Sequence, residues 1–166
     1  MNLRFRDATA ADAPVIAALQ NAVAGALTAR FGQGHWSLLT SERGAVLAQR
    51  HAKVRVGRTG RHILTVLRLA QKKPWAIDVS YFTSVKRPLY LTGLAVSVAH
   101  QGEGLGRLAL EDARTTAAAW PADAIRLDTY DAGAGAGAFY AKCGYNERGR
   151  AIYRGNPLIY YELVLA

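Results

Sequence analysis

The sequence predicts an α/β fold with a mixed, mostly antiparallel sheet and helices on both of its faces. Strand-like and helix-like patterns alternate along the whole chain of 166 residues. A helical segment separates the strand-like stretches 89–98 and 124–130. A helical crossover between neighbouring strands makes them parallel, so we expect a parallel pair here. The remaining strands follow one another closely, so we expect them to run in sequence order with several antiparallel pairs.

The first half of the chain predicts one strand, two helices and a hairpin. Thr9, followed three residues later by Asp12, has the form of a capping box at the start of a helix. Two strand-like stretches on either side of Gly60 are typical of a β-hairpin. The expected elements are a strand at 2–7, a helix with the apolar stripe Ile16, Leu19, Val23 and Leu27, a weaker helix at 36–49, and strands at 51–58 and 62–70.

The second half predicts four strands and two helices. The stretch 75–82 fits either a short strand or a structured loop. Pro121 ends the first helix, and Gly144 has the place of a C-terminal cap for the second. The expected elements are the strand 89–98, a helix with the stripe Leu105, Ala109, Ala113, Thr116 and Trp120, the strand 124–130, a short helix before Gly144, and strands at 150–155 and 158–165 around Gly155, Asn156 and Pro157.

Length and composition predict one domain over residues 1–166. Hydrophobic residues make up 51% and charged residues 20% of the chain, as in soluble globular proteins. The single cysteine, Cys143, rules out a disulfide framework and a cysteine-rich zinc site and favours a reducing compartment. No run of about eighteen apolar residues occurs, so we expect neither a signal peptide nor a membrane span. The expected location is the cytoplasm.

Positive charge is concentrated in residues 43–73, within a chain of net charge +9. The cations in "HAKVRVGR" alternate with Val54 and Val56, which is the period of a strand with one buried and one solvated face. No aromatic residue lies between Trp36 and Trp75 to stack on a base. A solvated outer face therefore explains the segment best. Attraction of an acidic ligand and binding of nucleic acid stay as alternatives.

Three glycines on alternate positions follow the strand 89–98 in "LAVSVAHQGEGLG". Glycines between a strand and a helix leave backbone N–H groups pointing at one place, which suits an anion. A nucleotide-hydrolase loop would need Lys and Ser or Thr where the chain has Arg107 and Leu108. A dinucleotide fingerprint would need wider glycine spacing and a place near the first strand.

The stretch resembles the central motif of the GCN5-related N-acetyltransferases, the GNAT family. Leu94, Ala95 and Val96 are followed at the family's spacing by the Gln/Arg-x-x-Gly-x-Gly pattern, here residues 101–106. A second stretch, "FYAKCGY" at residues 139–145, resembles the family's aromatic-Tyr-x-Lys-x-Gly-aromatic signature. The resemblance implies a GNAT-like fold with a splayed parallel strand pair. It also implies an N-acetyltransferase that transfers the acetyl group of acetyl-coenzyme A (acetyl-CoA) to a primary amine, by direct attack in a ternary complex.

Residue roles follow from the same resemblance. The Val96 backbone N–H would hold the oxyanion and Tyr140 would act as general acid. Lys142 would reach the adenosine phosphate or simply be solvated. Gly133 stands where the family often has Asn, in a Gly/Ala segment that is either flexible or open to the pantetheine arm. The implied cofactor-binding residues are Leu94, Ala95, Val96, Gln101, Gly102, Glu103, Gly104, Leu105, Gly106, Arg107, Gly133, Phe139, Tyr140 and Lys142.

The general base and the acceptor are left open by the sequence. The strand 89–98 contains no acidic residue, so the candidate bases are Asp78, Glu162, His35 or a water chain. The candidate acceptor residues are His35, Trp36, Asp78 and Tyr81. We expect a small-molecule or peptide amine as partner, no metal, no membrane and no nucleic acid, with a homodimer left open. The alternative function is a non-catalytic acyl-CoA sensor or a basic nucleic-acid-binding domain.

Overall fold

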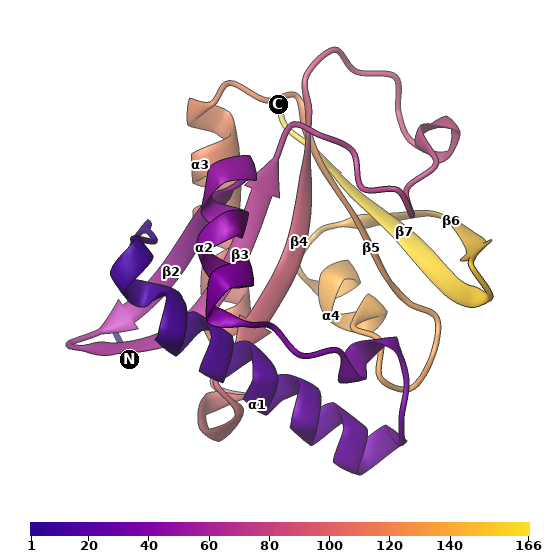
Figure 1. Ribbon diagram of the computed structural model, residues 1–166. Helices are drawn as coiled ribbons and strands as arrows, with labels where there is room; N and C mark the ends of the chain where they lie inside the picture. The colour runs from indigo at the N-terminus through magenta and orange to yellow at the C-terminus, as the bar shows by residue number, and fades with distance from the viewer. The chain divides into compact units, whose positions relative to one another are not determined.

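The computed structural model describes residues 1–166 as seven strands, four α-helices and four short 3-10 helices (Figure 1). The elements are β1 Arg4–Asp7, η1 Ala10–Asp12, α1 Ala13–Phe31, η2 His35–Ser37, α2 Glu42–His51, β2 Lys53–Thr59, β3 His62–Ala70, η3 Val79–Tyr81, β4 Pro88–Val96, η4 Val98–His100, α3 Leu105–Ala119, β5 Ala124–Tyr130, α4 Gly137–Lys142, β6 Asn146–Tyr153 and β7 Asn156–Val164.

The strands form one mixed sheet in the order β1-β2-β3-β4-β5-β7-β6, which confirms the predicted fold class. β4 and β5 are parallel, and the other pairs described are antiparallel. The predicted sequence order is wrong at one place, because β7 lies between β5 and β6. β7 follows β6 through a tight turn at Gly155 and then pairs with β5 along the whole of that strand.

The chain divides into two compact units. The first unit is Met1–Leu69 with Gly93–Ala113, and the second is Ala70–Thr92 with Arg114–Ala166. β4 and α3 each contribute a part to both units. That residues 1–166 form one domain stays a prediction.

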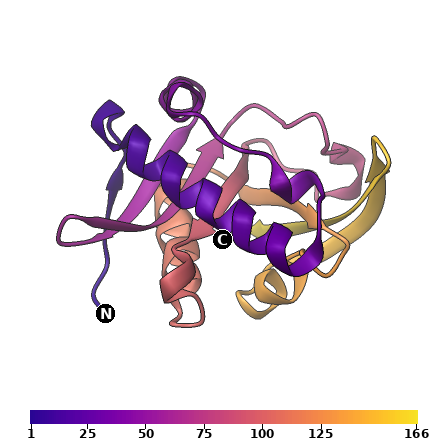
Figure 2. The same ribbon diagram turned by 60° about the horizontal axis from the view of Figure 1, so that its bottom comes forward.

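In the first unit, helices cover both faces of the strands (Figure 2). α1 and α2 pack on one face, where Ile16 and Ala45 meet Val54, Val56 and other apolar residues of β2 and β3. On the other face, Leu105 and Leu108 of α3 pack against Leu64 and Leu3. The predicted hairpin at 51–70 is confirmed. The predicted helix at 36–49 is not continuous. It is replaced by η2 and by α2, because Ser41 caps a new helix start, its Oγ accepting from the Gly44 N–H at 3.0 Å.

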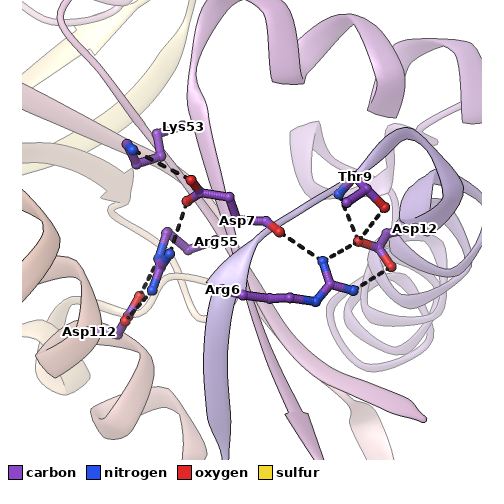
Figure 3. Close-up of polar contacts among 7 residues, drawn as sticks. All are labelled: Arg6, Asp7, Thr9, Asp12, Lys53, Arg55 and Asp112. Carbon is purple, nitrogen blue, oxygen red and sulfur yellow. Dashed lines mark hydrogen bonds and ion pairs between the residues drawn. The ribbon is translucent and has the colours of Figure 1, made fainter.

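The predicted capping box is present at the start of the first helix (Figure 3). The Thr9 N–H donates to Asp12 Oδ2 at 2.8 Å. The Arg6 guanidinium donates to both carboxylate oxygens of Asp12, at 2.7 and 2.9 Å. These bonds hold the pKa of Asp12 well below its usual range, at about 2. Arg6 and Asp12 thus join β1 to the helix start.

A second polar cluster joins α3 to the sheet (Figure 3). Arg55 of β2 donates to Asp112 of α3 through Nε at 2.8 Å and Nη2 at 2.7 Å, and to Asp7 through Nη1 at 2.9 Å. Its side chain is only 16% exposed. Arg55 therefore departs from the predicted solvated face, because α3 covers its side of the strand.

Helix Ala10–Phe31 is long and apolar enough, by length and composition alone, to cross a membrane. In the structure, the buried side chains of its inner face, including Ala13, Ile16 and Leu19, pack on the sheet of the first unit. The expectation of no membrane span stays a prediction.

In the second unit, residues 71–87 form a structured loop rather than a strand. The loop carries η3 and packs onto the sheet through Ile77 and Phe82, which meet Tyr90 and Tyr160 in a small core. The parallel pairing of β4 with β5 covers Pro88–Tyr90 against Ala124–Arg126. β4 continues beyond this paired stretch to Val96.

Candidate functional site

The glycine turn between β4 and α3 has the backbone that an anion site needs. Gly102 and Gly104 both have φ of 84°, a conformation that favours glycine. A Cβ at either position would meet no other atom within 4 Å. The space next to both Cα atoms is therefore open, and a ligand could approach the backbone closely there.

Hydrogen bonds and packing hold the turn in place. The Gln101 side chain donates to the Val96 carbonyl at 3.2 Å, which ties the turn back to the end of β4. Leu105 is buried, so the first residue of α3 anchors the helix and contributes only its backbone to the turn. The first intrahelical bond runs from the Leu108 N–H to the Gly104 carbonyl at 3.3 Å. The N–H groups of the first turn thus lie at the open end of the helix, where the helix dipole adds positive charge.

Val96 presents its backbone N–H away from β3. The neighbouring Ser97 N–H donates to the Leu64 carbonyl of β3 at 2.8 Å. Successive N–H groups of a strand point to opposite edges, so the Val96 N–H points to the other edge of β4. This is the orientation that the predicted role in holding an oxyanion requires.

Tyr140 lies on α4 in the second unit, and its ring is buried against three other aromatic rings. The ring centroids of Phe139, Tyr145 and Tyr161 lie 5.3, 5.8 and 6.1 Å from that of Tyr140. Burial raises the pKa of the Tyr140 hydroxyl, and the nearby Asp128 carboxylate adds to the shift. The hydroxyl therefore stays protonated at neutral pH. It makes no hydrogen bond to the backbone, whereas the Tyr160 hydroxyl donates to the Ala76 carbonyl.

The Gly/Ala segment before α4 is folded. A Cβ on Gly135 would lie 1.8 Å from the Tyr130 carbonyl oxygen, and one on Gly137 would lie 2.9 Å from the Tyr161 hydroxyl. The Ala136 N–H donates to the Thr129 hydroxyl at 3.0 Å. Close packing against the Tyr130 carbonyl and the Tyr161 side chain thus explains two of these glycines without a flexible segment. Of the predicted residues, Gly133 lies in this turn and Lys142 is exposed at the end of α4.

Asp128, in the middle of β5, is an acidic residue that sequence reasoning missed. It lies opposite Tyr160 in the β5–β7 register. Burial raises the pKa of its carboxyl group, and no ion pair or hydrogen bond lowers it. A desolvated carboxylate of this kind is a stronger base than an ordinary aspartate. The sequence shows Asp128 as the one acid inside the strand "AIRLDTY", but whether an acid on a strand is buried or solvated depends on packing that the sequence pattern does not record.

Two of the predicted bases have structural roles. Asp78 caps η3, and its Oδ1 accepts from the Ser80 N–H at 3.0 Å and from the Ser80 hydroxyl at 2.7 Å. These bonds lower the pKa of Asp78, which weakens it as a base. Glu162 is 1% exposed and forms an ion pair with Arg126 at 2.9 Å. Neither arrangement favours proton abstraction.

The predicted acceptor residues fall into two groups. His35 and Trp36 form η2 in the first unit, where the Trp36 ring lies against Gly34 and its Nε1 donates to the Gly32 carbonyl at 2.9 Å. Asp78 and Tyr81 share the 71–87 loop of the second unit, where Tyr81 packs edge-on against Tyr160. No group of three His, Cys, Asp or Glu side chains could hold a metal ion.

A mixed sheet whose parallel pair is joined by a glycine turn and a crossover helix is the architecture of the acyl-CoA N-acyltransferases. Residues 72–145 match the model of the Acetyltransferase (GNAT) family. The match includes both the glycine turn and the "FYAKCGY" stretch, and it confirms the resemblance drawn from those residues. A comparison with curated proteins gives no match.

Solved acetyltransferase structures share the fold over nearly the whole chain. A GNAT-family acetyltransferase from Listeria monocytogenes is 20% identical, with a TM-score of 0.76 over 98% of this chain and 95% of that one. The Salmonella typhimurium protein yncA, described as a candidate acetyltransferase with its cofactor acetyl-CoA, is 17% identical, with a TM-score of 0.73 over 100% and 95%. The ribosomal-protein-S18-alanine N-acetyltransferase of Escherichia coli is 15% identical, with a TM-score of 0.71 over 99% and 95%. At these identities the likeness shows the fold.

Proposed function

We propose that this protein is an N-acetyltransferase that transfers the acetyl group of acetyl-CoA to a primary amine of a small molecule or peptide. The observation that carries the proposal is the open glycine turn at Gly102 and Gly104, followed directly by the N-terminus of α3. The match to the GNAT family model supports it, as does the acetyl-CoA described with the Salmonella protein.

The backbone of the first unit would bind the donor. The N–H groups of the turn 101–107 would hold the diphosphate, because two glycines leave room for it and the helix dipole favours its charge. Backbone groups of Leu94 and Val96 would pair with the amides of the pantetheine arm, as in strand addition to a sheet edge. Gly133, Phe139 and Lys142 are proposed as donor contacts from the second unit.

Three groups of the chain would perform the transfer. Asp128 takes a proton from the acceptor ammonium, whose pKa of about 10 leaves little free amine at neutral pH. The amine nitrogen then bonds to the acetyl carbon, and the Val96 N–H donates to the carbonyl oxygen as it gains negative charge in the tetrahedral intermediate. The nitrogen loses its second proton to solvent as the carbon–sulfur bond breaks. Tyr140 gives a proton to the departing sulfur and recovers one from solvent. The products are the acetylated amine and coenzyme A.

A thiol-release assay over a panel of amines, peptides and aminoglycosides tests this proposal. We expect release of coenzyme A from acetyl-CoA with at least one acceptor, above the background without acceptor. Binding of acetyl-CoA without release by any amine would favour a non-catalytic acyl-CoA sensor. Salt-sensitive binding of DNA or RNA with no response to acetyl-CoA would favour the basic nucleic-acid-binding domain.

A further inference from the structure

The guanidinium of Arg68 lies directly on the backbone of Gly93. Arg68 is in β3 opposite Val54, and Gly93 is in β4 with φ of 64°. A Cβ on Gly93 would lie 2.7 Å from Arg68 Nη2 and 2.8 Å from Arg68 Nε. Glycine at position 93 therefore leaves the space that the guanidinium fills.

Arg68 has no counter-ion. Its Nε is buried and has no hydrogen-bond partner. Burial lowers the pKa of Arg68, and no carboxylate acts against that shift. Two other arginines of the chain differ, since Arg55 is held by Asp7 and Asp112 and Arg126 by Glu162. A desolvated cation without a partner is unfavourable unless a ligand supplies the anion.

The position of Arg68 along β4 relates it to the proposed donor. Gly93 precedes Val96 by three residues, which span about 10 Å in an extended strand. In the proposed function the Val96 N–H holds the thioester carbonyl. A ligand group bound to Arg68 then lies no farther from the reacting carbon than the length of a small molecule. The Arg68 side chain as a whole is partly exposed, so a ligand can reach it.

We propose that Arg68 binds a carboxylate of the acceptor, and that the acceptor is a small amino acid or a close relative with its amine and carboxylate within about 10 Å. The planar guanidinium matches a carboxylate with two parallel hydrogen bonds. This inference rests on the proposed function. It narrows the amine from any primary amine to one that carries an acid group.

Matched acceptors and a matched control variant test the proposal. A panel of small amino acids is used, each paired with its amide, which keeps the amine but lacks the carboxylate charge. Arg58 also has a buried Nε without a partner, but it lies in β2 opposite Ile63, so Arg58→Gln is the control. We expect Arg68→Gln to lower kcat/KM for the acids about 30-fold or more, mainly through KM, and to leave the amides and the KM for acetyl-CoA unchanged. Arg68→Lys should restore part of the loss, and Arg58→Gln should keep the preference for acids.

A melting experiment tests the same proposal without turnover. Arg68→Gln removes a partly buried charge whose Nε has no partner, so the unliganded variant should melt at a higher temperature than the wild type. With coenzyme A present, N-acetylglycine should raise the melting temperature of the wild type but not that of Arg68→Gln. Equal kcat/KM for acids and amides in the wild type, or a variant that melts lower and still responds to N-acetylglycine, would overturn the proposal. Absence of thiol release with every amine would refute the proposed function instead. The melting experiment would still decide whether Arg68 binds a carboxylate.

Discussion

Arg126 and Glu162 are direct partners across β5 and β7 and form a buried ion pair, with Nε and Oε2 2.9 Å apart. Their side chains are 5% and 1% exposed. Glu162 Oε1 also accepts from the Thr83 N–H at 3.2 Å, and Arg126 donates to the Thr83 carbonyl. The pair thus fastens the 71–87 loop to the sheet. Both oxygens of the Glu162 carboxylate have partners in this structure, so Glu162 is unsuited to act as the base.

Glu162→Gln should destabilise the protein, because it leaves the Arg126 charge buried without its partner. We expect a loss of about 3–5 kcal/mol in the free energy of unfolding, measured by urea denaturation. The double variant Arg126→Met with Glu162→Leu removes both charges and should lose less. A Glu162→Gln protein of normal stability but without activity would instead identify Glu162 as the base.

Asp128→Asn should lower the activity of the protein and raise its stability. Loss of the proposed base should lower kcat about 10²- to 10⁴-fold, while Asp78→Asn should have little effect. Burial raises the pKa of Asp128 above its ordinary 3.8 in the folded protein, so the charged form opposes folding at neutral pH. The variant should therefore melt higher than the wild type at neutral pH, and this gain should disappear at pH values below 3.8.

The pH profile gives a second test of Asp128. Because the base must be deprotonated, kcat/KM of the wild type should fall as the pH drops through the raised pKa. An Asp128→Asn enzyme with unchanged kcat would contradict the assignment.

Tyr140→Phe should lower kcat roughly 10²-fold, within the usual range for a general acid, and change the KM for acetyl-CoA little because the ring still packs. Tyr145→Phe is the matched control, since the Tyr145 hydroxyl is also buried and has no hydrogen-bond partner. It should keep full activity. If both variants match the wild type when chemistry limits the rate, Tyr140 is a packing residue and solvent is the acid.

Asp12→Asn should destabilise the protein at neutral pH, because it weakens the bonds from Arg6 and from the Thr9 N–H. The folded-state pKa of Asp12 is about 2, lower than its ordinary 3.8. Its contribution is therefore complete above the ordinary value and is lost as the pH falls toward the lower one. Melting temperatures of wild type and variant should converge in this acidic range. A constant difference across it would show that the Arg6–Asp12 pair contributes little.

Sequence patterns predicted the parts of the fold that depend on local spacing. The hairpin around Gly60, the capping box of Thr9 and Asp12, and the crossover helix after the glycine turn depend on neighbouring residues, and the structure has all three. The place of β7 between β5 and β6 depends on long-range pairing, which no local pattern records.

The candidate site was likewise predictable only where it depends on neighbouring residues. The glycine turn was visible in the sequence because its glycines lie close together along the chain, on alternate positions. The environments of Asp128 and Arg68 were not, because strand register and packing decide whether a charged side chain is solvated, paired or left alone. Arg55 and Arg68 belong to the same basic segment, yet one is held by two carboxylates and the other by none.

Calorimetric titration of acetyl-CoA into the wild type and Gly104→Val tests most directly whether the glycine turn binds the donor. The wild type should bind acetyl-CoA. Gly104→Val should bind at least about 100-fold more weakly, because the side chain displaces the diphosphate from charge-assisted bonds each worth about 1.5–3 kcal/mol. Gly155→Val is the control, because Gly155 has a similar φ of 80° and equally open surroundings but lies at the β6–β7 turn. The Gly155→Val protein should bind acetyl-CoA as the wild type does. A wild type that does not bind acetyl-CoA, or a folded Gly104→Val that binds it as tightly as the wild type, would contradict the assignment of the turn.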